Sequence, residues 1–430
     1  MRKGLAGMLA LSTLGLAVVV LVLSVFGGTT AAQGPDGISI YYVAPSCLGI
    51  PTPCYAEVQA AVDDADDPGD VVRIAQGTYS AVHLRNGTTQ AVHLTKTVTI
   101  RGGYAPDFGI WDPDAYPTIL DALSLGRVFY IEGEGSPVIE GLTITRGDSG
   151  AGGGSGGGGG ILAIGDPGPA LTVTLRHNRV VSNTAGTGFG GGGLSIIFTN
   201  LVMEDNLVGH NQSAGTGGGM RLEQTNADLI NTLWRDNSTT ASGGAVYAAN
   251  LASVEMTNTV MIDNDASNAG GAMVAAAAYV EAKHSTVARN TGGDGSAIYV
   301  TSGSLPGSGP STVLMVNTIL ASQAIGVTVM PGPEWYTHTA TLGYTLWDGA
   351  GVLNTGAGDF TEAFTMIGGA SFCSDGYHIC PASDAIDQAL PVGVTFDIDR
   401  QARPARAGYD LGADEMYLSV YLPLVLRGLP

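Results

Sequence analysis

Three carboxylates recur along the middle of the chain at an almost constant spacing: Asp228, Glu255 and Glu281 lie 27 and 26 residues apart. If residues one period apart stack on neighbouring parallel strands, their side chains stand ~4.8 Å from each other. Like charges that close raise a pKa or recruit a cation, and Ca²⁺, which takes several oxygen ligands, is the natural candidate. The alternative is a solvated acidic strip, partly neutralised by Lys283 on the same face.

A second column with chemical potential immediately precedes a recurring Asn: Ser182, His210, Asp236, Asp263 and Arg289. Two carboxylates ~5 Å apart are what a retaining glycosidase uses, one as acid and one as nucleophile, so Asp236 and Asp263 are candidate catalytic residues. The aromatic sugar platforms that such an enzyme needs would come from Trp234, Tyr247 or Tyr299. The alternative is a ladder of turns whose charges compensate each other.

Acidic residues also crowd the C-terminal part of the chain. Asp397, Asp399 and Asp410 belong to a group of six carboxylates that extends from Asp387 to Glu415, over 29 positions. Ca²⁺ is the candidate ligand here as well, and the alternative is a structural or anchoring role.

A sequence repeat must position these residues. Each copy of the repeat ends in an Asn, and successive copies are 28, 26, 27 and 26 residues apart. These residues are Asn183, Asn211, Asn237, Asn264 and Asn290. A Gly-Gly-apolar marker separates the copies. Apolar residues alternate within each unit, which predicts short strands. A unit of this length cannot bury its apolar face alone and therefore predicts one coil of a parallel β-solenoid.

Stacking in register would let the five Asn side chains hydrogen-bond to one another as a structural ladder. A further column is predicted to face inward and to be satisfied within the stack: His177, Asp205, Asn231, Asn258, His284 and Asn317. Residues 71–79, 98–104, 128–131 and 141–145 are predicted strands. Residues 55–63 are predicted to form a helix that covers the open end of the solenoid, and the glycine run 152–160 a flexible loop.

Composition restricts the class of partner. The chain has 38 acidic and 18 basic residues, a net charge of −20, so nucleic acids and anionic lipid are excluded as partners. The 65 glycines follow no Gly-X-Y period, which excludes collagen. Hydrophobic residues make up 44% of the chain, enough for a packed core.

The termini and the cysteines indicate export. Residues 1–32 are a predicted signal peptide, with an apolar stretch from Met8 to Phe26; the alternative is an uncleaved signal anchor. In an oxidising compartment, Cys47 with Cys54 and Cys373 with Cys380 would form two local disulfides. Residues 417–430 are an apolar tail, either an attachment signal or a last strand, and membrane contact would involve only this tail or the N-terminal segment.

Several motifs resemble those of known exported bacterial proteins. The segments Tyr42–Ser46, Glu57–Asp64 and Gly77–Tyr79 look like the first coil of pectin-lyase-like β-helix proteins. The repeat resembles that of polymorphic outer membrane proteins. The segments Ser383–Asp387 and Asp410–Glu415 are similar to the choice-of-anchor domain that closes many exported β-helices.

The resemblance implies an all-β fold, a right-handed parallel β-helix over residues 38–345 with an N-terminal helical cap. A β-rich closing, anchor-like module would follow at 346–416.

We expect a secreted or cell-surface protein that binds carbohydrate or a partner surface without catalysis, as an adhesin does. The alternatives are a polysaccharide lyase or glycoside hydrolase working on the outer face, and a passive cell-envelope spacer. For a lyase, the resemblance implies a basic residue beside a Ca²⁺ site, which makes Lys283 a further catalytic candidate. An enzyme would also need a groove over the acidic stripe, walled by residues 302–309 or 152–160.

Overall fold

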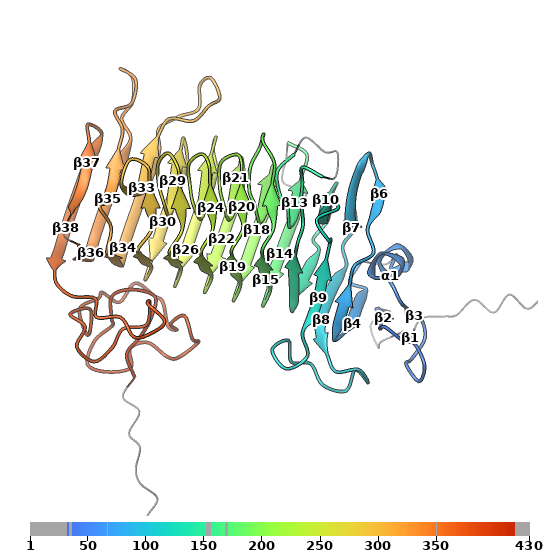
Figure 1. The fold of residues 1–430 in the computed structure, drawn as a ribbon. Helices are drawn as coiled ribbons and strands as arrows, with labels where there is room; N and C mark the ends of the chain where they lie inside the picture. The colour runs from blue at the N-terminus through green and yellow to red at the C-terminus, as the bar shows by residue number, and fades with distance from the viewer. Residues whose placement is uncertain are drawn as a thin grey trace, which may run out of the picture.

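The computed structural model describes residues 32–33, 37–66, 68–151, 156–167, 171–349 and 351–417. They form a right-handed parallel β-helix, an elongated stack of coils with its long axis across Figure 1. The described residues contain one α-helix, α1 (Val58–Asp64). The predicted all-β fold class is therefore confirmed.

The strands form three sheets in which equivalent strands of successive coils pair in parallel. The sheet of eleven strands contains β6 (His83–Arg85), β7 (Thr88–Leu94), β10 (Arg127–Glu132), β13 (Ile161–Ile164), β17 (Leu194–Ile197), β21 (Met220–Glu223), β25 (Val246–Ala249), β29 (Met273–Ala276), β33 (Ser296–Thr301), β35 (Ile325–Val329) and β37 (Val352–Gly356). The sheet of five contains β16 (Thr184–Ala185), β20 (Gln212–Ser213), β24 (Ser238–Thr239), β28 (Asp265–Ala266) and β32 (Thr291–Gly292).

The sheet of twenty-two strands supplies two strands to each regular coil. It contains β1 (Ala32–Gln33), β2 (Ser39–Val43), β3 (Cys54–Tyr55), β4 (Val71–Ala75), β5 (Gly77–Tyr79), β8 (Thr99–Tyr104), β9 (Thr118–Asp121), β11 (Val138–Glu140), β12 (Leu142–Thr145), β14 (Thr172–Arg176), β15 (Arg179–Val181), β18 (Asn200–Glu204), β19 (Leu207–Gly209), β22 (Asn226–Ile230), β23 (Leu233–Arg235), β26 (Ser253–Thr257), β27 (Val260–Ile262), β30 (Tyr279–Lys283), β31 (Thr286–Ala288), β34 (Thr312–Ala321), β36 (Thr339–Asp348) and β38 (Asp359–Ile367).

One coil shows why the repeat has its polar markers. The chain runs along β21 and β22, turns at Asn231, follows β23 and turns again at Asp236 before β24. Both turn residues have left-handed backbone angles, with φ of 48° and 55°. Asn and Asp enter this conformation more readily than other side chains, because they hydrogen-bond locally.

The core is a file of apolar side chains that runs from coil to coil. Leu201 pairs with Ala227, Ala227 with Val254, and Val254 with Val280. All four are buried. This register repeats every 26 or 27 residues, so the coil length agrees with the repeat in the sequence.

A ladder of buried Asn side chains runs beside this core. The Nδ2 of each Asn donates to the Oδ1 of the next, from Asn183 through Asn211, Asn237 and Asn264 to Asn290, at 2.8–3.0 Å. The backbone N–H of Asn290 continues the ladder by donating to Gln323. The ladder thus joins successive coils through side chains as well as through the sheets.

The glycine run is part of the stack, so the prediction of a flexible loop is wrong for residues 156–160. The N–H groups of Gly158, Gly159 and Gly160 donate to carbonyls of the next coil at 2.9–3.1 Å. A Cβ on Gly157 would lie 1.5 Å from the carbonyl oxygen of Gly190. Glycine is needed here because neighbouring backbones approach this closely. Residues 152–155 lie outside the described residues.

The helix α1 covers the N-terminal end of the stack, and its Val58, Ala61 and Val62 belong to the main core. The disulfide Cys47–Cys54 closes a loop beside it. At the other end, the parallel strands continue through β36 and β38 to Ile367, so the predicted boundary at 345/346 falls inside β36.

Residues 368–416, which we call the clasp, follow the last strand and lie alongside the C-terminal coils (Figure 1). The clasp consists mostly of turns, with three isolated antiparallel bridges and the disulfide Cys373–Cys380. Its Ile379, Ala385 and Leu411 share a second core with residues of the coils, such as Val260 and Ile319. This second core holds the clasp against the β-helix.

No helix in the described ranges has the length and apolar character needed to cross a membrane. The predicted signal peptide up to Ala31 and the apolar tail beyond Tyr417 lie outside the described residues.

Candidate binding groove

The column that begins at His177 lies on the outside of the coils, so the prediction that it faces inward is wrong. Its members occupy left-handed turns with φ between 48° and 56°. The polar side chains that face the interior of the coils belong to the next residues along the chain. Asn178 and Asn206 are examples, and they hydrogen-bond to each other across coils. The turn residues therefore point away from the core.

The clasp covers the C-terminal half of this column. The Nδ2 of Asn258 donates to the carbonyl of Phe396 at 2.6 Å, and the Nδ2 of Asn317 donates to the carbonyl of Leu390 at 2.7 Å. Between them, the Nδ1 of His284 lies 3.2 Å from the carbonyl oxygen of Asp410. These side chains are buried by the clasp and not by the solenoid.

A groove of about 290 Å³ lies on this side of the β-helix, where the column emerges from under the clasp. Residues of β12, β15 and β19 form its floor. Pro113 and Asp114 close one end, and Tyr377, Ile398 and Asp399 of the clasp close the other. The polar side chains in its lining include His177, Asn178, Arg179, Asp205 and Asn206.

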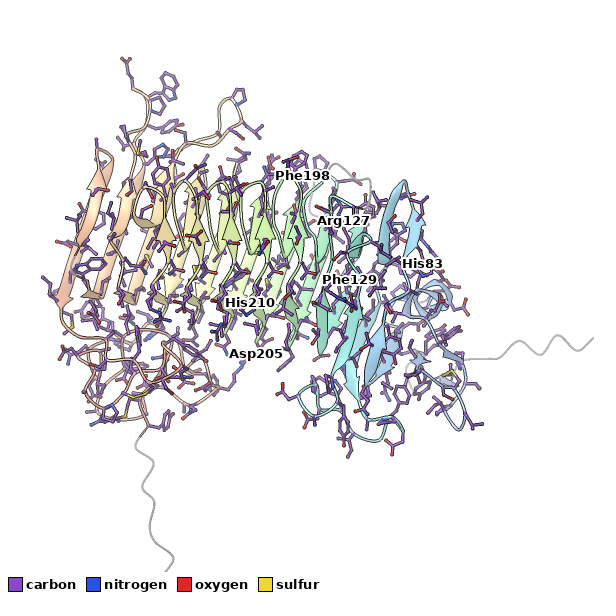
Figure 2. The ribbon with its side chains drawn as sticks, viewed as in Figure 1. His83, Arg127, Phe129, Phe198, Asp205 and His210 are labelled. Atoms are coloured by element: carbon purple, nitrogen blue, oxygen red, sulfur yellow. A yellow bond between two sulfur atoms is a disulfide. The ribbon has the colours of Figure 1, made fainter. Side chains whose placement is uncertain are left out.

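The charges in the groove compensate each other. His177 Nε2 lies 3.4 Å from Asp205 Oδ2, and Asn231 donates to Asp205 Oδ1 at 3.1 Å. Arg400 of the clasp also donates to Asp205, which lies on the lower edge of the coils in Figure 2, the edge along which the clasp runs. The groove thus presents amide, imidazole, guanidinium and carboxylate groups without a large net charge.

An aromatic ring lies beside the groove, next to the lining residue His177. Trp111, 38% exposed, lies edge-on to His177 with 6.0 Å between the ring centroids. Its indole N–H donates to the carbonyl of Gly102 at 2.8 Å, and the Arg101 guanidinium lies 5.4 Å from the ring centroid. A positioned aromatic ring beside hydrogen-bonding groups can hold the apolar face and the hydroxyls of a sugar ring.

The acidic stripe lies elsewhere, on the outer face of β22, β26 and β30. Asp228 pairs in register with Glu255, and Glu255 with Glu281. The stripe spans two strand spacings, or roughly 10 Å. Within the described residues its carboxylates are not among the groups whose ligand atoms converge within 4.8 Å of one another. The Nζ of Lys283 lies 2.9 Å from Glu281 Oε1 and already neutralises one end of the stripe.

Asp236 and Asp263 lie in left-handed turns, and the carboxylate of each forms an ion pair with an arginine. Arg289 donates to both oxygens of Asp263 at 2.8 Å, and the Nε of Arg235 donates to Asp236 at 2.9 Å. The ion pairs favour the turn-ladder interpretation of this column.

The expected aromatic platforms do not lie beside these carboxylates. Trp234 is fully buried in the main core, so its prediction as a sugar platform is wrong. Tyr247 and Tyr299 belong to β25 and β33, in the sheet of eleven strands, and pack against a small cluster there.

Two of the predicted cation ligands near the C-terminus hold the clasp's own backbone. Asp397 accepts hydrogen bonds from the N–H groups of Asp399, Gln401 and Glu415, and Asp410 accepts from those of Asp387 and Met416. Both carboxylates are fully buried, and burial raises the pKa of each. Asp399, by contrast, is exposed at the groove.

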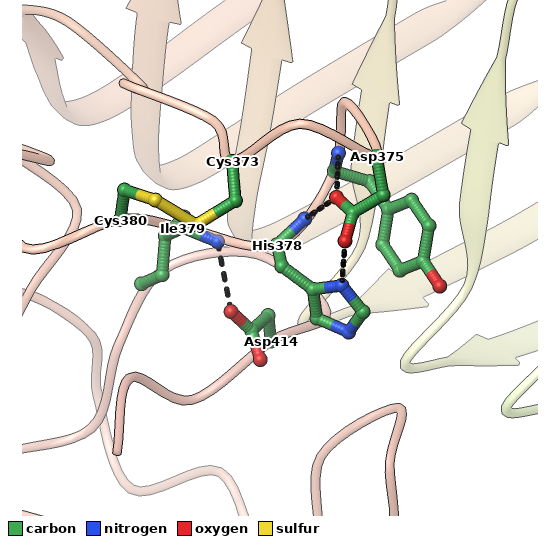
Figure 3. Close-up of a disulfide and its surroundings, with 7 residues drawn as sticks. Cys373, Asp375, His378, Ile379, Cys380 and Asp414 are labelled. Atoms are coloured by element: carbon green, nitrogen blue, oxygen red, sulfur yellow. Dashed lines mark hydrogen bonds and ion pairs between the residues drawn. A yellow bond between two sulfur atoms is a disulfide. The ribbon is translucent and has the colours of Figure 1, made fainter. Parts of the chain in front are cut away.

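Sequence reasoning missed a cluster that surrounds Asp399. His378 Nδ1 lies 2.6 Å from Asp375 Oδ2, and His378 Nε2 lies 2.8 Å from Asp399 Oδ2. Asp414 completes the cluster. Figure 3 shows Asp375, His378 and Asp414 beside the disulfide Cys373–Cys380. The available signal was an Asp and a His three residues apart between two cysteines.

Burial and ion pairing oppose each other in this cluster. Burial alone would lower the pKa of His378, but its ion pairs with Asp399 and Asp375 raise that pKa to about 9. Burial raises the pKa of Asp414 to about 6, despite its hydrogen bond from the N–H of Ile379 and the nearby His378.

Comparison with known proteins informs the fold. No protein-family model and no curated protein sequence matches this chain. Among solved structures, the chain is similar to the crystal structure of pectate lyase Pel9A, with a TM-score of 0.52 and 12% sequence identity. The match covers 91% of this chain and 98% of that chain. At this identity the likeness supports the parallel β-helix fold and nothing beyond it.

Proposed function

We propose that this β-helix is an exported cell-surface protein that binds a neutral polysaccharide in the groove between Trp111 and the clasp, without cleaving it. The observation that carries the proposal is a groove of compensated polar groups whose lining residue His177 lies against the partly exposed indole ring of Trp111. Such a surface suits a ligand rich in hydroxyls, which offers both donors and acceptors. The net charge of −20 disfavours polyanionic glycans, so the ligand is a neutral one.

Two features support export. The disulfides Cys47–Cys54 and Cys373–Cys380 are typical of proteins in an oxidising compartment. They lie near opposite ends of the β-helix. The N-terminal sequence has the charge and apolar pattern of a secretion signal. Attachment to the surface would then follow from the resemblance of the C-terminal part to a choice-of-anchor domain.

Catalysis as a lyase is the second candidate, because the chain shares its fold with a pectate lyase. The environment of Lys283 argues against it. The hydrogen bond to Glu281 raises the pKa of Lys283 above its usual value, outweighing the lowering by burial. A base that abstracts a proton near neutral pH needs the opposite shift.

Glycoside hydrolysis has less support. Arg289 donates to both oxygens of Asp263, which favours the ionised carboxylate and disfavours the protonated form that an acid needs to protonate a leaving group.

A panel of immobilised neutral and acidic polysaccharides tests the proposal, with bound protein measured for wild type and two tryptophan variants. Trp111→Ala should weaken binding to neutral glycans by about fivefold, since a positioned aromatic ring contributes on the order of 1 kcal/mol. Trp335→Ala is the matched control, because Trp335 is 80% exposed and its ring contact is with Tyr336, which does not line the groove.

The outcomes separate the candidates. Loss of binding in Trp335→Ala, with binding retained in Trp111→Ala, would place the ligand outside the groove. Release of reducing ends, or ultraviolet absorbance from a new carbon–carbon double bond, would replace the binding proposal with hydrolysis or elimination. Binding to a protein ligand alone would favour an adhesin for a partner surface, and no binding would leave a passive spacer.

A further inference from the structure

We infer that the clasp contains a binding site for a divalent transition metal of the Zn²⁺ type, with His378, Asp399 and Asp414 as ligands. Each of the three can offer one ligand atom, and these atoms lie within 4.8 Å of one another. Across the described part of the chain, this is the one group of three or more such residues that converges in this way.

The histidine is oriented as a metal ligand would be. Its Nδ1 faces Asp375 Oδ2 at 2.6 Å, so that in the neutral ring that binds a metal Nδ1 would keep the proton and the lone pair would lie on Nε2. That Nε2 faces Asp399 Oδ2 at 2.8 Å. A carboxylate behind a histidine is the usual second-shell arrangement at metal sites, where it sets the tautomer and the ring orientation.

Asp414 supplies an independent indication that the cluster has room for a cation. Its side chain is 5% exposed, and its carboxylate receives one hydrogen bond, from the N–H of Ile379 to Oδ2 at 2.8 Å. Within the described residues, the second oxygen has no hydrogen-bond donor. A buried carboxylate with an unpaired oxygen is costly unless a positive charge compensates it.

His378 Nε2 is also buried and makes no hydrogen bond of good geometry, only the ion pair with Asp399. Two of the three proposed ligands, His378 and Asp414, thus carry an atom that makes no hydrogen bond within the described residues.

The donor set selects the class of metal. One imidazole nitrogen with two carboxylates suits Zn²⁺ and its neighbours, whereas Ca²⁺ takes six to eight oxygen ligands and avoids imidazole. Zn²⁺ would draw the three atoms to ~2.0–2.2 Å and leave a fourth position for water. Cys373 and Cys380 cannot act as ligands because their sulfur atoms form a disulfide.

The disulfide gives the site a rigid frame. It closes the loop that carries Asp375 and His378, and Asp375 Oδ1 also accepts the backbone N–H groups of Tyr377 and His378 at 3.1 Å. Asp399 and Tyr377 line the groove, so the metal would lie in the groove wall.

Calorimetric titration of the chelator-treated protein with Zn²⁺, and separately with Ca²⁺, tests the inference. We expect one Zn²⁺ per chain and at least a hundredfold weaker binding of Zn²⁺ in His378→Gln and Asp414→Asn. His177→Gln should bind as wild type, because His177 also faces a carboxylate but lies outside the cluster. Ca²⁺ should not compete.

Asp375→Asn keeps all three ligands and provides the test if the ligand variants do not fold. It should weaken Zn²⁺ binding by about 10–100-fold, the usual effect of losing a second-shell carboxylate. Absence of Zn²⁺ binding in the wild type, or unchanged affinity in His378→Gln or in Asp375→Asn, would overturn the inference and leave an ion-pair cluster. The measurement uses no glycan, so its result is separate from that of the proposed function.

Discussion

Arg400 forms a bidentate ion pair with Asp205, a residue 195 positions earlier in the chain. The guanidinium Nε donates to Oδ1 at 2.9 Å and Nη2 donates to Oδ2 at 2.6 Å. Asp205 lines the groove, and Arg400 belongs to the clasp. The pair therefore joins the clasp to the coil that carries Asp205, beside the groove.

Arg400→Gln should loosen this edge of the clasp. The pair is partly exposed, so its loss should cost only about 1 kcal/mol of the free energy of unfolding. Hydrogen exchange measured by mass spectrometry should show faster exchange over residues 390–402. Arg406→Gln, at an exposed clasp arginine, should leave that exchange unchanged. Equal exchange in the Arg400 variant and the wild type would mean that the ion pair does not hold the clasp.

Asn237→Ala should destabilise the β-helix by about 3 kcal/mol, because it leaves several buried polar groups without partners. Asn237 donates to Val208 and Asn264 and accepts from Asn211, and it is fully buried. The matched control is Asn226→Ala, since Asn226 also bonds to an Asn of the neighbouring coil, Asn200, but at an exposed position. Urea unfolding should show a cost below about 0.5 kcal/mol for the control. Similar costs for the two variants would contradict a special role for the buried ladder.

His284 should make stability depend on pH in the acid range. Burial, with a contribution from Arg403, lowers the pKa of His284 to about 3 in the folded protein, whereas the unfolded value is ~6.5. The unfolded chain binds the proton more readily, so this stabilisation is complete above pH ~6.5 and is lost as the pH falls toward 3.

His284→Asn should flatten this part of the stability profile. Asn occupies the equivalent turns at Asn258 and Asn317, so the substitution suits the backbone there. The titratable side chains that face His284 from the clasp are those of Arg403 and Tyr409, and the substitution changes neither of them. Thermal unfolding between pH 4 and pH 7 compares the variant with wild type and with His177→Asn, at a half-exposed turn. A variant profile as steep as that of wild type would refute the assignment.

Glu255→Gln should slightly stabilise the protein at low salt, by about 0.5 kcal/mol. Glu255 lies between Asp228 and Glu281 on neighbouring strands, and like charges directly opposite each other repel. The gain should fade with added salt. Because the carboxylates of the stripe do not converge on one point, Ca²⁺ should raise the melting temperatures of the variant and the wild type equally. A Ca²⁺ effect that disappears in Glu255→Gln, but not in a Glu134→Gln control, would instead make the stripe a cation site.

The regular coils were predictable from sequence because their determinants are local and repeated. The Asn183–Asn290 column has one residue type at one spacing, and parallel stacking leaves it a single arrangement. Apolar alternation likewise placed the strands on either side of residues such as Asn231.

The groove was not predictable, because a non-repetitive segment decides which turns are covered. His177 and His284 share a backbone conformation and a position in the repeat, yet the first is half-exposed and the second is buried. The difference comes from the clasp, whose Asp410 lies 126 residues beyond His284. The His378 cluster was missed for a related reason, since Asp375, Asp399 and Asp414 meet only once the clasp has folded.

The span of the clasp has an evolutionary consequence. Solenoids gain and lose coils by duplication and deletion, since each coil contacts only its neighbours. Here the clasp binds turns in several coils, from Asp205 through Asn258 and His284 to Asn317. One coil inserted among them would displace half of these partners by ~4.8 Å relative to the rest. Homologues should therefore vary in coil number on the N-terminal side of Asp205 and keep a constant number beneath the clasp.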